Sequence, residues 1–126
     1  MTASPFVLVT DDDEDLRLLC EMYLQLDGFT VGHAVNGRDA IARVHARRPD
    51  LILLDLMMPV MDGWECLAAL KADPATRDIP VFIITGKNQL ADQERAFSMG
   101  AEAFIPKPFQ GPALVARIRQ RLAGAA

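Results

Sequence analysis

The most constraining stretch of the chain is 51–63, which reads LILLDLMMPVMDG. Its leading run of Leu51 to Leu54 is apolar without alternation, a pattern typical of a strand buried on both faces in a helix-covered parallel sheet. Asp55 follows directly, and a charge closing a buried run is costly unless the strand emerges there at the edge of the sheet. Ligands bind at that edge in open parallel sheets. We therefore predict that Asp55 projects from a strand end into a cleft.

The rest of the chain repeats a strand–helix pattern. Apolar runs predict strands over 6–9, 29–34, 51–54, 80–85 and 103–105. Helical spacing predicts helices that begin near Leu16, after Asn36, and near Gly63, Leu90 and Gly111. The partly polar run 29–34 is expected near an edge. Right-handed crossovers make this an α/β fold, a doubly wound three-layer sandwich, in one domain over 1–126.

The bulk composition narrows the class of protein. The chain is 51% hydrophobic and 24% charged, which is ordinary for a globular domain. A net charge of −4 argues weakly against direct nucleic-acid binding. No apolar run is long enough for membrane insertion and no secretory signal is recognisable, so we expect a cytoplasmic protein. Cys20 and Cys66 fall on apolar helix faces and are expected to be buried thiols.

Polar residues follow the strands of this predicted sheet. Asp11 and Asp12 follow the first strand, Asp55 the third, Thr85 the fourth and Lys107 the fifth. Parallel strands place these ends on one rim, where converging carboxylates repel unless a cation lies among them. Hard oxygen ligands suit Mg²⁺. A divalent ion, a lysine and a hydroxyl favour phosphoryl chemistry, with Asp55 as the best candidate nucleophile.

Each of these residues alone has an ordinary explanation. The acidic run 11–15 suits a solvated helix start, and Asp13, Glu14 and Asp15 are expected to be only that. Lys107 alone would be a surface lysine. His33 and His45 have no acidic or histidine partner at ligand spacing in the sequence, so both are expected to be ordinary. It is the combination of strand ends that indicates a site.

In combination, the motifs resemble the receiver domain of bacterial two-component response regulators. The resemblance spans essentially the whole chain and is carried by Asp11-Asp12 in VTDDDED, Asp55 in LLDLMMPVMDG, Thr85-Gly86 in IITGK and Lys107-Pro108-Phe109 in IPKPF. It implies a flavodoxin-like five-stranded sheet in the order 2-1-3-4-5, with the site between strands 1 and 3.

The resemblance also implies roles for individual residues. Asp55 is expected to be the phosphoacceptor, and Asp12, Asp55 and the backbone carbonyl of Met57 to bind Mg²⁺, with Asp11 helping through water. Thr85, in the Thr85-Gly86 pair, and Lys107 are expected to contact the acyl phosphate, and the Lys107–Pro108 bond to be cis. Such a protein is no classical enzyme, because it only catalyses its own phosphorylation and slow dephosphorylation.

The expected partners follow from the same resemblance. The phosphoryl donor would be a histidine kinase or a histidine phosphotransfer protein, and a downstream protein would read the modified state. The reading face, and a possible homodimer interface, would be built from the helix near Leu90, strand 103–105 and the helix near Gly111. The family's switch aromatic, often Tyr, is Phe104 here. No output domain is apparent, so a stand-alone receiver is expected.

Two further positions are expected to tune the lifetime of the phosphorylated state. Met57 and Lys87 lie two residues beyond Asp55 and Thr85, where family members flank the route of the hydrolytic water. An apolar Met could shield the phosphoryl group and Lys87 could pair with its oxygens. We predict self-dephosphorylation over minutes rather than seconds.

Two alternatives stay open at this point. A phosphatase of the haloacid dehalogenase type also uses a strand-end Asp with Mg²⁺, but it needs a second Asp two residues on, where this chain has Met57. A pseudo-receiver that only binds partners usually lacks part of the acidic triad or the lysine, and this chain keeps them all. The sequence does not identify the kinase, the pathway, the target or the oligomeric state.

Overall fold

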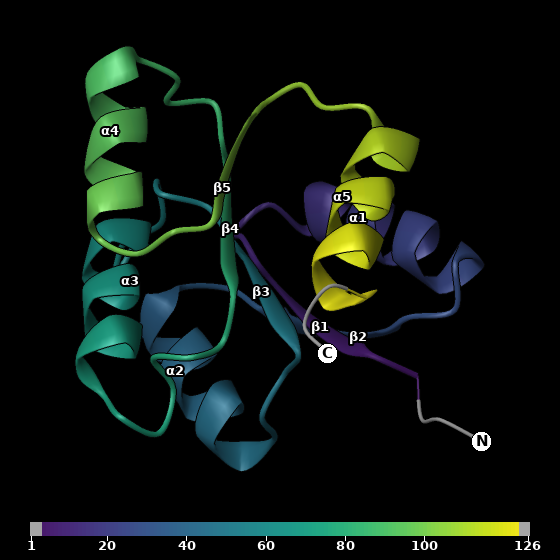
Figure 1. Cartoon of the computed structure of the whole chain (residues 1–126), viewed down its shortest axis with the longest axis horizontal. Helices are drawn as coiled ribbons and strands as arrows, with labels where there is room; N and C mark the ends of the chain where they lie inside the picture. Colours follow the sequence, from purple (N-terminus) through teal and green to yellow (C-terminus); the bar gives the residue numbers. More distant parts are fainter. Residues whose placement is uncertain (1–3, 124–126) are drawn as a thin grey trace.

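The structure is a computed structural model that describes residues 4–123, in which strands and helices alternate along the chain (Figure 1). The strands are β1 Phe6–Thr10, β2 Thr30–Ala34, β3 Leu51–Leu54, β4 Val81–Thr85 and β5 Ala103–Pro106. The helices are α1 Glu14–Leu26, α2 Gly37–Ala46, α3 Gly63–Ala72, α4 Leu90–Ser98 and α5 Gly111–Ala123. All ten elements lie where the sequence predicts them, to within a few residues at their ends.

The strands form one parallel sheet in the order β2-β1-β3-β4-β5, as predicted. The partly polar β2 lies at an edge, which is also as predicted. Thr10 pairs with Ala34 on one side and Leu54 on the other, so the carboxyl ends of β1, β2 and β3 are level. Thr85 and Pro106 pair in the same way. The residues that follow these strands therefore share one rim of the sheet.

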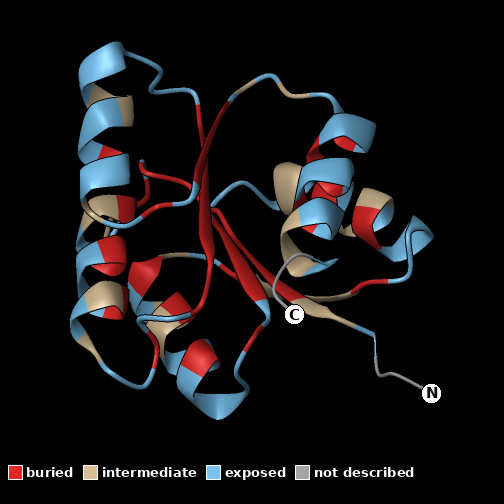
Figure 2. Cartoon of the chain, viewed as in Figure 1, coloured by how far each residue is buried: buried red, intermediate tan, exposed pale blue. Residues whose placement is uncertain are grey.

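Helices cover both faces of the sheet, with α2, α3 and α4 on one side and α1 and α5 on the other (Figure 1). Side chains alternate between the two cores along each strand. Leu8, Ile52 and Ile83 pack under α2, α3 and α4, whereas Val9 and Leu53 pack under α1 and α5. Every residue of β3 and β4 is buried, and the sheet runs as a buried layer through the molecule (Figure 2).

Local sequence signals account for the ends of the helices. Asp13 caps α1 by accepting hydrogen bonds from the backbone N–H groups of Asp15 and Leu16. Asn36 caps α2, and Asp62 forms a capping box with Glu65 at the start of α3. Gly100 follows α4 with a φ of 103°, a conformation that glycine adopts without strain. Asp13 therefore has the helix-starting role that the sequence predicts.

Both cysteines are buried in the two cores, as predicted. Cys20 lies on the buried face of α1 and Cys66 on that of α3, and burial raises the pKa of each thiol from 9.0 to about 12. Both are therefore protonated and unreactive near neutral pH. Within residues 4–123, the structure has no helix of the length and hydropathy needed to cross a membrane.

Candidate functional site

Three carboxylates converge at the rim of the sheet. Asp11 follows β1 and is 1% exposed, Asp55 follows β3 and is 5% exposed, and Asp12 is exposed to solvent. One carboxylate oxygen from each lies within 4.8 Å of the others. The structure thus brings together the acidic residues that the sequence selects.

Asp11 is fixed through all of its polar groups. Its backbone N–H donates to the carbonyl of Ala34 on β2 at 3.0 Å, and its own carbonyl accepts from Nη1 of Arg17 at 2.7 Å. Its Oδ1 accepts from the backbone N–H of Asp13 at 2.9 Å, and its Oδ2 accepts from Nζ of Lys107 at 2.8 Å. Its position is therefore set by contacts from β2, α1 and the segment after β5.

Asp55 is held at the carboxyl end of β3 by contacts with the backbone. Its backbone N–H donates to the carbonyl of Thr10 at 3.0 Å, and its Oδ1 accepts from the N–H of Met57 at 3.4 Å. Gly63, the first residue of α3, passes so close that a Cβ there would lie 2.1 Å from the carbonyl oxygen of Asp55. Only glycine permits this approach, which explains why the motif contains one.

Lys107 bridges the two buried carboxylates. Its Nζ lies 2.8 Å from Oδ2 of Asp11 and 3.4 Å from Oδ2 of Asp55. Its backbone N–H donates to the carbonyl of Thr85 at 2.9 Å, and the Lys107–Pro108 bond is cis, as predicted. These contacts place the ammonium group over the acidic cluster.

The electrostatics of Asp11 and Lys107 reflect this arrangement. Burial raises the pKa of Asp11 above its ordinary value, even though hydrogen bonds from Lys107 and Asp13 act in the opposite direction. Burial alone would lower the pKa of Lys107, but the hydrogen bond to Asp11 and the nearby charge of Asp55 outweigh it and raise that pKa. Lys107 is therefore charged at neutral pH, and it only partly offsets the negative charge of the site.

Thr85 ends β4 and Phe104 lies on the neighbouring strand β5. Thr85 is fully buried, and its Oγ1 accepts from the backbone N–H of Lys87 at 3.2 Å. Phe104 is 8% exposed and packs in the core under α4. The ammonium of Lys87 lies 3.6 Å from Oδ1 of Asp92 on α4, so in this structure it pairs with α4.

A concavity of about 510 Å³ opens beside the acidic cluster. It is lined by Asp12, Leu56, Met57, Met58, Pro59, Asp62, Trp64 and Lys87. Met57 is 63% exposed at this opening, whereas Met58 is buried. A larger concavity of about 700 Å³ lies near the amino ends of the strands, away from the acidic rim.

The donor set fits Mg²⁺. Carboxylate oxygens are the hard ligands that this ion prefers, and the partial exposure of the cluster leaves room for the waters it retains. A divalent cation would also offset the repulsion that the single ammonium of Lys107 leaves. Asp11, Asp12 and Asp55 are the residues that would hold it.

Sequence reasoning missed two supports of this site. Arg17 donates a hydrogen bond from Nη1 to the carbonyl of Asp11 and another from Nε to Nδ1 of His33, at 3.3 Å. His33, expected to be ordinary, also lies 3.2 Å from the carboxylate of Glu21. No spacing in the sequence points to these contacts, because they join α1 to the edge strand β2.

Comparisons with known proteins agree with this geometry. The model of the response regulator receiver domain family matches residues 7–119. The transcriptional regulatory protein PrrA of Mycobacterium tuberculosis is 40% identical over 119 residues, which cover 94% of this chain and 50% of that protein. The phosphate regulon transcriptional regulatory protein PhoB of Rhizobium meliloti is 33% identical over 118 residues, or 94% of this chain and 52% of that one. The chain thus spans about half the length of these curated relatives.

Solved structures give the same answer for the fold. The chemotaxis protein CheY4 of Vibrio cholerae superposes with a TM-score of 0.87 at 29% identity, covering 94% of this chain and 98% of that one. The receiver domain of a Luxo repressor protein from Vibrio parahaemolyticus superposes with a TM-score of 0.90 at 29% identity, covering 97% and 92%. Neither the fold nor the relatives support the phosphatase or pseudo-receiver alternatives. The chain belongs to the response regulator receiver domains of two-component signalling.

Proposed function

We propose that Asp55 is the phosphoacceptor of this receiver domain. The observation that carries the proposal is the position of its carboxylate, which lies at the end of β3 within 4.8 Å of Asp11 and Asp12 and 3.4 Å from Nζ of Lys107. The oxygens of Asp11 accept short hydrogen bonds, from the N–H of Asp13 at 2.9 Å and from Nζ of Lys107 at 2.8 Å, whereas those of Asp55 accept only at 3.4 Å, from Met57 and Lys107. Asp55 is therefore the buried carboxylate that has a nearby cation and the longer, weaker internal hydrogen bonds.

The transfer conserves atoms and charge in a simple way. A carboxylate oxygen of Asp55 attacks the phosphorus of a phosphohistidine, the P–O bond forms, and the P–N bond to imidazole breaks. The released imidazole nitrogen takes up a proton. Lys107 stays close to the oxygens on which negative charge accumulates, and Thr85 supplies a hydroxyl after releasing the N–H of Lys87.

Mg²⁺ would be held by Asp12, Asp55 and the backbone carbonyl of Met57, with Asp11 acting through water. When bound, the ion neutralises charge on the phosphoryl oxygens. The convergence of hard oxygen donors on the rim supports this assignment. Gly86 directly follows Thr85 at the end of β4, and a Cβ there would meet nothing within 4 Å, so the space beside it is open to the phosphate.

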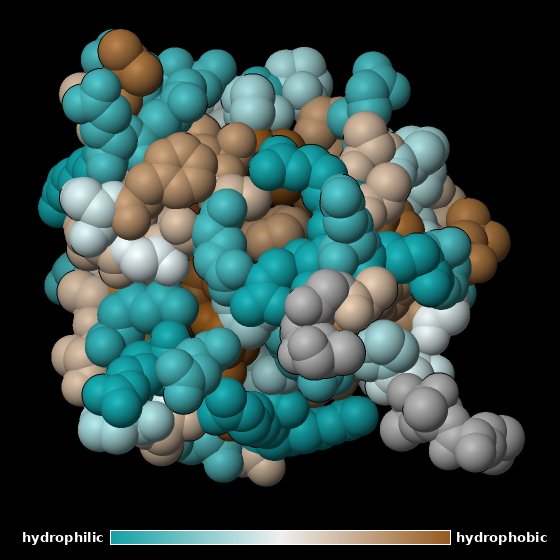
Figure 3. All heavy atoms as spheres, viewed as in Figure 1, coloured by the Kyte–Doolittle hydropathy of each residue, from teal (hydrophilic) through white to brown (hydrophobic). Residues whose placement is uncertain are grey.

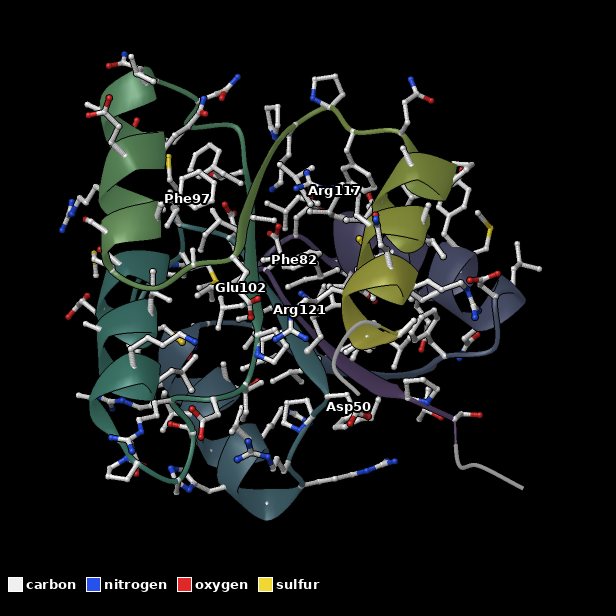
Figure 4. The ribbon with its side chains drawn as sticks, viewed as in Figure 1. Asp50, Phe82, Phe97, Glu102, Arg117 and Arg121 are labelled. Atoms are coloured by element: carbon white, nitrogen blue, oxygen red, sulfur yellow. The ribbon has the colours of Figure 1, made fainter. Side chains whose placement is uncertain are left out.

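The face formed by α4, β5 and α5 is proposed to report the phosphorylated state to a partner. Phe97 of α4 is 49% exposed on this face, which also carries the ion pair of Glu102 and Arg121 (Figure 4), and Leu90 at the start of α4 is 69% exposed. Hydrophilic side chains cross the middle of this face and a hydrophobic group lies over α4 (Figure 3). Phe104 connects the face to the site because it lies on β5 in the core under α4.

The partners proposed for this surface and site are a histidine kinase or phosphotransfer protein as donor and a downstream protein as target. A homodimer through the α4–β5–α5 face is part of the same proposal, as are a single receiver domain over 1–126 and a cytoplasmic location. Helix α5 carries Arg117, Arg119 and Arg121. Within residues 4–123, Arg119 forms an ion pair with Asp27 and Arg121 with Glu102, whereas Arg117 forms none. Arg117 is therefore the arginine left to bind an acidic group of a partner protein.

The proposal is tested by intact mass after incubation with Mg²⁺ and acetyl phosphate. We expect one phosphate adduct on wild type that requires Mg²⁺, and none on Asp55→Asn. Asp12→Asn keeps the acceptor but loses a proposed ligand, so it should be modified more slowly and need more Mg²⁺. An adduct of equal yield on Asp55→Asn would overturn the assignment.

A further inference from the structure

Arg17 connects three elements of the fold at the site. From α1, its Nη1 donates to the carbonyl of Asp11 at 2.7 Å and its Nε donates to Nδ1 of His33 on β2 at 3.3 Å. The carbonyl of Asp11 belongs to the peptide bond that joins Asp11 to Asp12, whose carboxylate is exposed. Arg17 therefore holds the backbone from which both carboxylates project.

The contact with His33 fixes the chemistry of that ring. Arginine has no acceptor group, so Nδ1 of His33 must be the acceptor in this hydrogen bond. Its Nε2 then carries the proton and lies 3.2 Å from Oε2 of Glu21, one turn further along α1. The guanidinium is thus oriented by a ring that is itself oriented by a carboxylate, in the manner of the outer partners that orient metal ligands.

We propose that Arg17 is a positioning residue for the metal site, held in place by His33 and Glu21. It acts through the backbone of Asp11, which fixes the directions of the Asp11 and Asp12 carboxylates. The inference rests on the proposed function only in naming Mg²⁺ as the ion. Its consequence is that loss of Arg17 weakens Mg²⁺ binding.

The sign of this effect separates positioning from simple electrostatics. Arg17 is a cation beside an acidic cluster, so by Coulomb repulsion alone its removal would strengthen the binding of a divalent cation. Positioning predicts the opposite, because misdirected carboxylates bind the ion less well. Arg43 offers a matched control: it is an exposed arginine on α2 whose ion pair with Asp39 lies outside the acidic cluster.

The test is Mg²⁺ titration by calorimetry of wild type, Arg17→Gln, Arg17→Lys and Arg43→Gln. We expect Arg17→Gln to bind Mg²⁺ about tenfold more weakly, as is typical when an outer partner of a metal ligand is lost. Arg17→Lys keeps the charge and one donor and should recover part of the affinity, and Arg43→Gln should match wild type. Equal or tighter binding by Arg17→Gln would overturn the proposal.

A second pair of variants guards against an unfolded Arg17→Gln. His33→Gln retains an acceptor for Arg17 and a donor for Glu21, whereas His33→Ala retains neither. We expect His33→Ala to weaken Mg²⁺ binding and His33→Gln to stay close to wild type; the reverse order, or no difference, would count against the network. If wild type takes up no phosphate from acetyl phosphate while the variants keep this order of Mg²⁺ affinities, the proposed function is refuted and the positioning role stands.

Discussion

Lys107 lies closer to Asp11 than to the proposed phosphoacceptor Asp55, at 2.8 Å against 3.4 Å. The lysine is therefore committed chiefly to a carboxylate that is fully buried and already fixed by its other contacts. This leaves Asp55 as the less constrained acid of the pair. In the unphosphorylated site the ammonium of Lys107 therefore lies beside the acceptor, and the carboxylate of Asp11 that binds it is buried.

Asp11→Asn should stabilise the protein in the absence of Mg²⁺. The pKa of Asp11 is raised on folding, so the folded state binds its proton more tightly than the unfolded state does. Stability is therefore lost as pH rises from the ordinary value of 3.8 through the raised pKa, and the full penalty is present at pH 7. We expect a higher free energy of unfolding for the variant at pH 7, measured by urea titration with EDTA.

Asp12→Asn is the matched control for this prediction. It removes the same charge from an exposed residue and should change apo stability less. The advantage of Asp11→Asn should shrink as pH falls toward 3.8, because wild type is then protonated as well. A variant less stable than wild type at pH 7 would show that the bond to Lys107 outweighs the cost of burial.

Thr10→Val should also stabilise the protein. The Oγ1 of Thr10 is the buried side-chain polar atom that lacks a hydrogen-bond partner within residues 4–123. Valine has the same shape and removes that cost, so the free energy of unfolding should rise by about 1 kcal/mol. Thr76→Val is the opposite case, since the buried Oγ1 of Thr76 donates to the carbonyl of Leu70 at 2.7 Å. That variant should lose about 1–2 kcal/mol, and equal effects of the two substitutions would refute the argument.

Gly63→Ala should damage both the fold and the site. The added Cβ would lie 2.1 Å from the carbonyl oxygen of Asp55 and 2.6 Å from Cα of Leu56, both of which are backbone atoms. We expect a loss of about 3 kcal/mol or more, together with slower phosphorylation in any protein that folds. Gly86→Ala, in another loop of the same rim, meets nothing within 4 Å and should unfold at the wild-type temperature. Wild-type stability of Gly63→Ala would contradict the close approach.

Met57→Asn should shorten the lifetime of the phosphorylated protein. Met57 is 63% exposed at the opening beside Asp12, where its apolar chain can exclude water from the phosphoryl group. An amide could instead hold a water, so hydrolysis should be about tenfold faster than in wild type, for which we predict a half-life of minutes. The measurement is the decay of the phosphorylated mass after removal of acetyl phosphate. Asp92→Asn, which releases Lys87 from α4, should have the smaller and opposite effect.

The fold could be predicted from the sequence because its strands are buried on both faces. Unbroken apolar runs such as 51–54 leave few other interpretations, and the partly polar 29–34 run identifies the edge strand. The acidic cluster could also be predicted, because Asp11 and Asp55 follow parallel strands and such strands end on the same rim of the sheet. Topology alone therefore predicts which residues meet.

Contacts between side chains of different helices and strands could not be predicted from the sequence. The bonds of Arg17 to His33 and of Arg121 to Glu102 depend on how α1 and α5 are placed against the sheet, which no spacing specifies. The backbone of Val60 was equally unpredictable: this β-branched residue has a φ of 70°. It is held there by a turn in which the N–H of Met61 donates to the carbonyl of Pro59 at 2.8 Å.

The most direct test of the account is to locate the modified residue chemically. Borohydride reduces an aspartyl phosphate to homoserine, which peptide mass spectrometry can place in the chain. After treatment with Mg²⁺ and acetyl phosphate, we predict homoserine at position 55 and unmodified aspartate at Asp11 and Asp12. Homoserine at Asp11 or Asp12, or none at any position in protein that binds Mg²⁺, would contradict the assignment of Asp55 as phosphoacceptor.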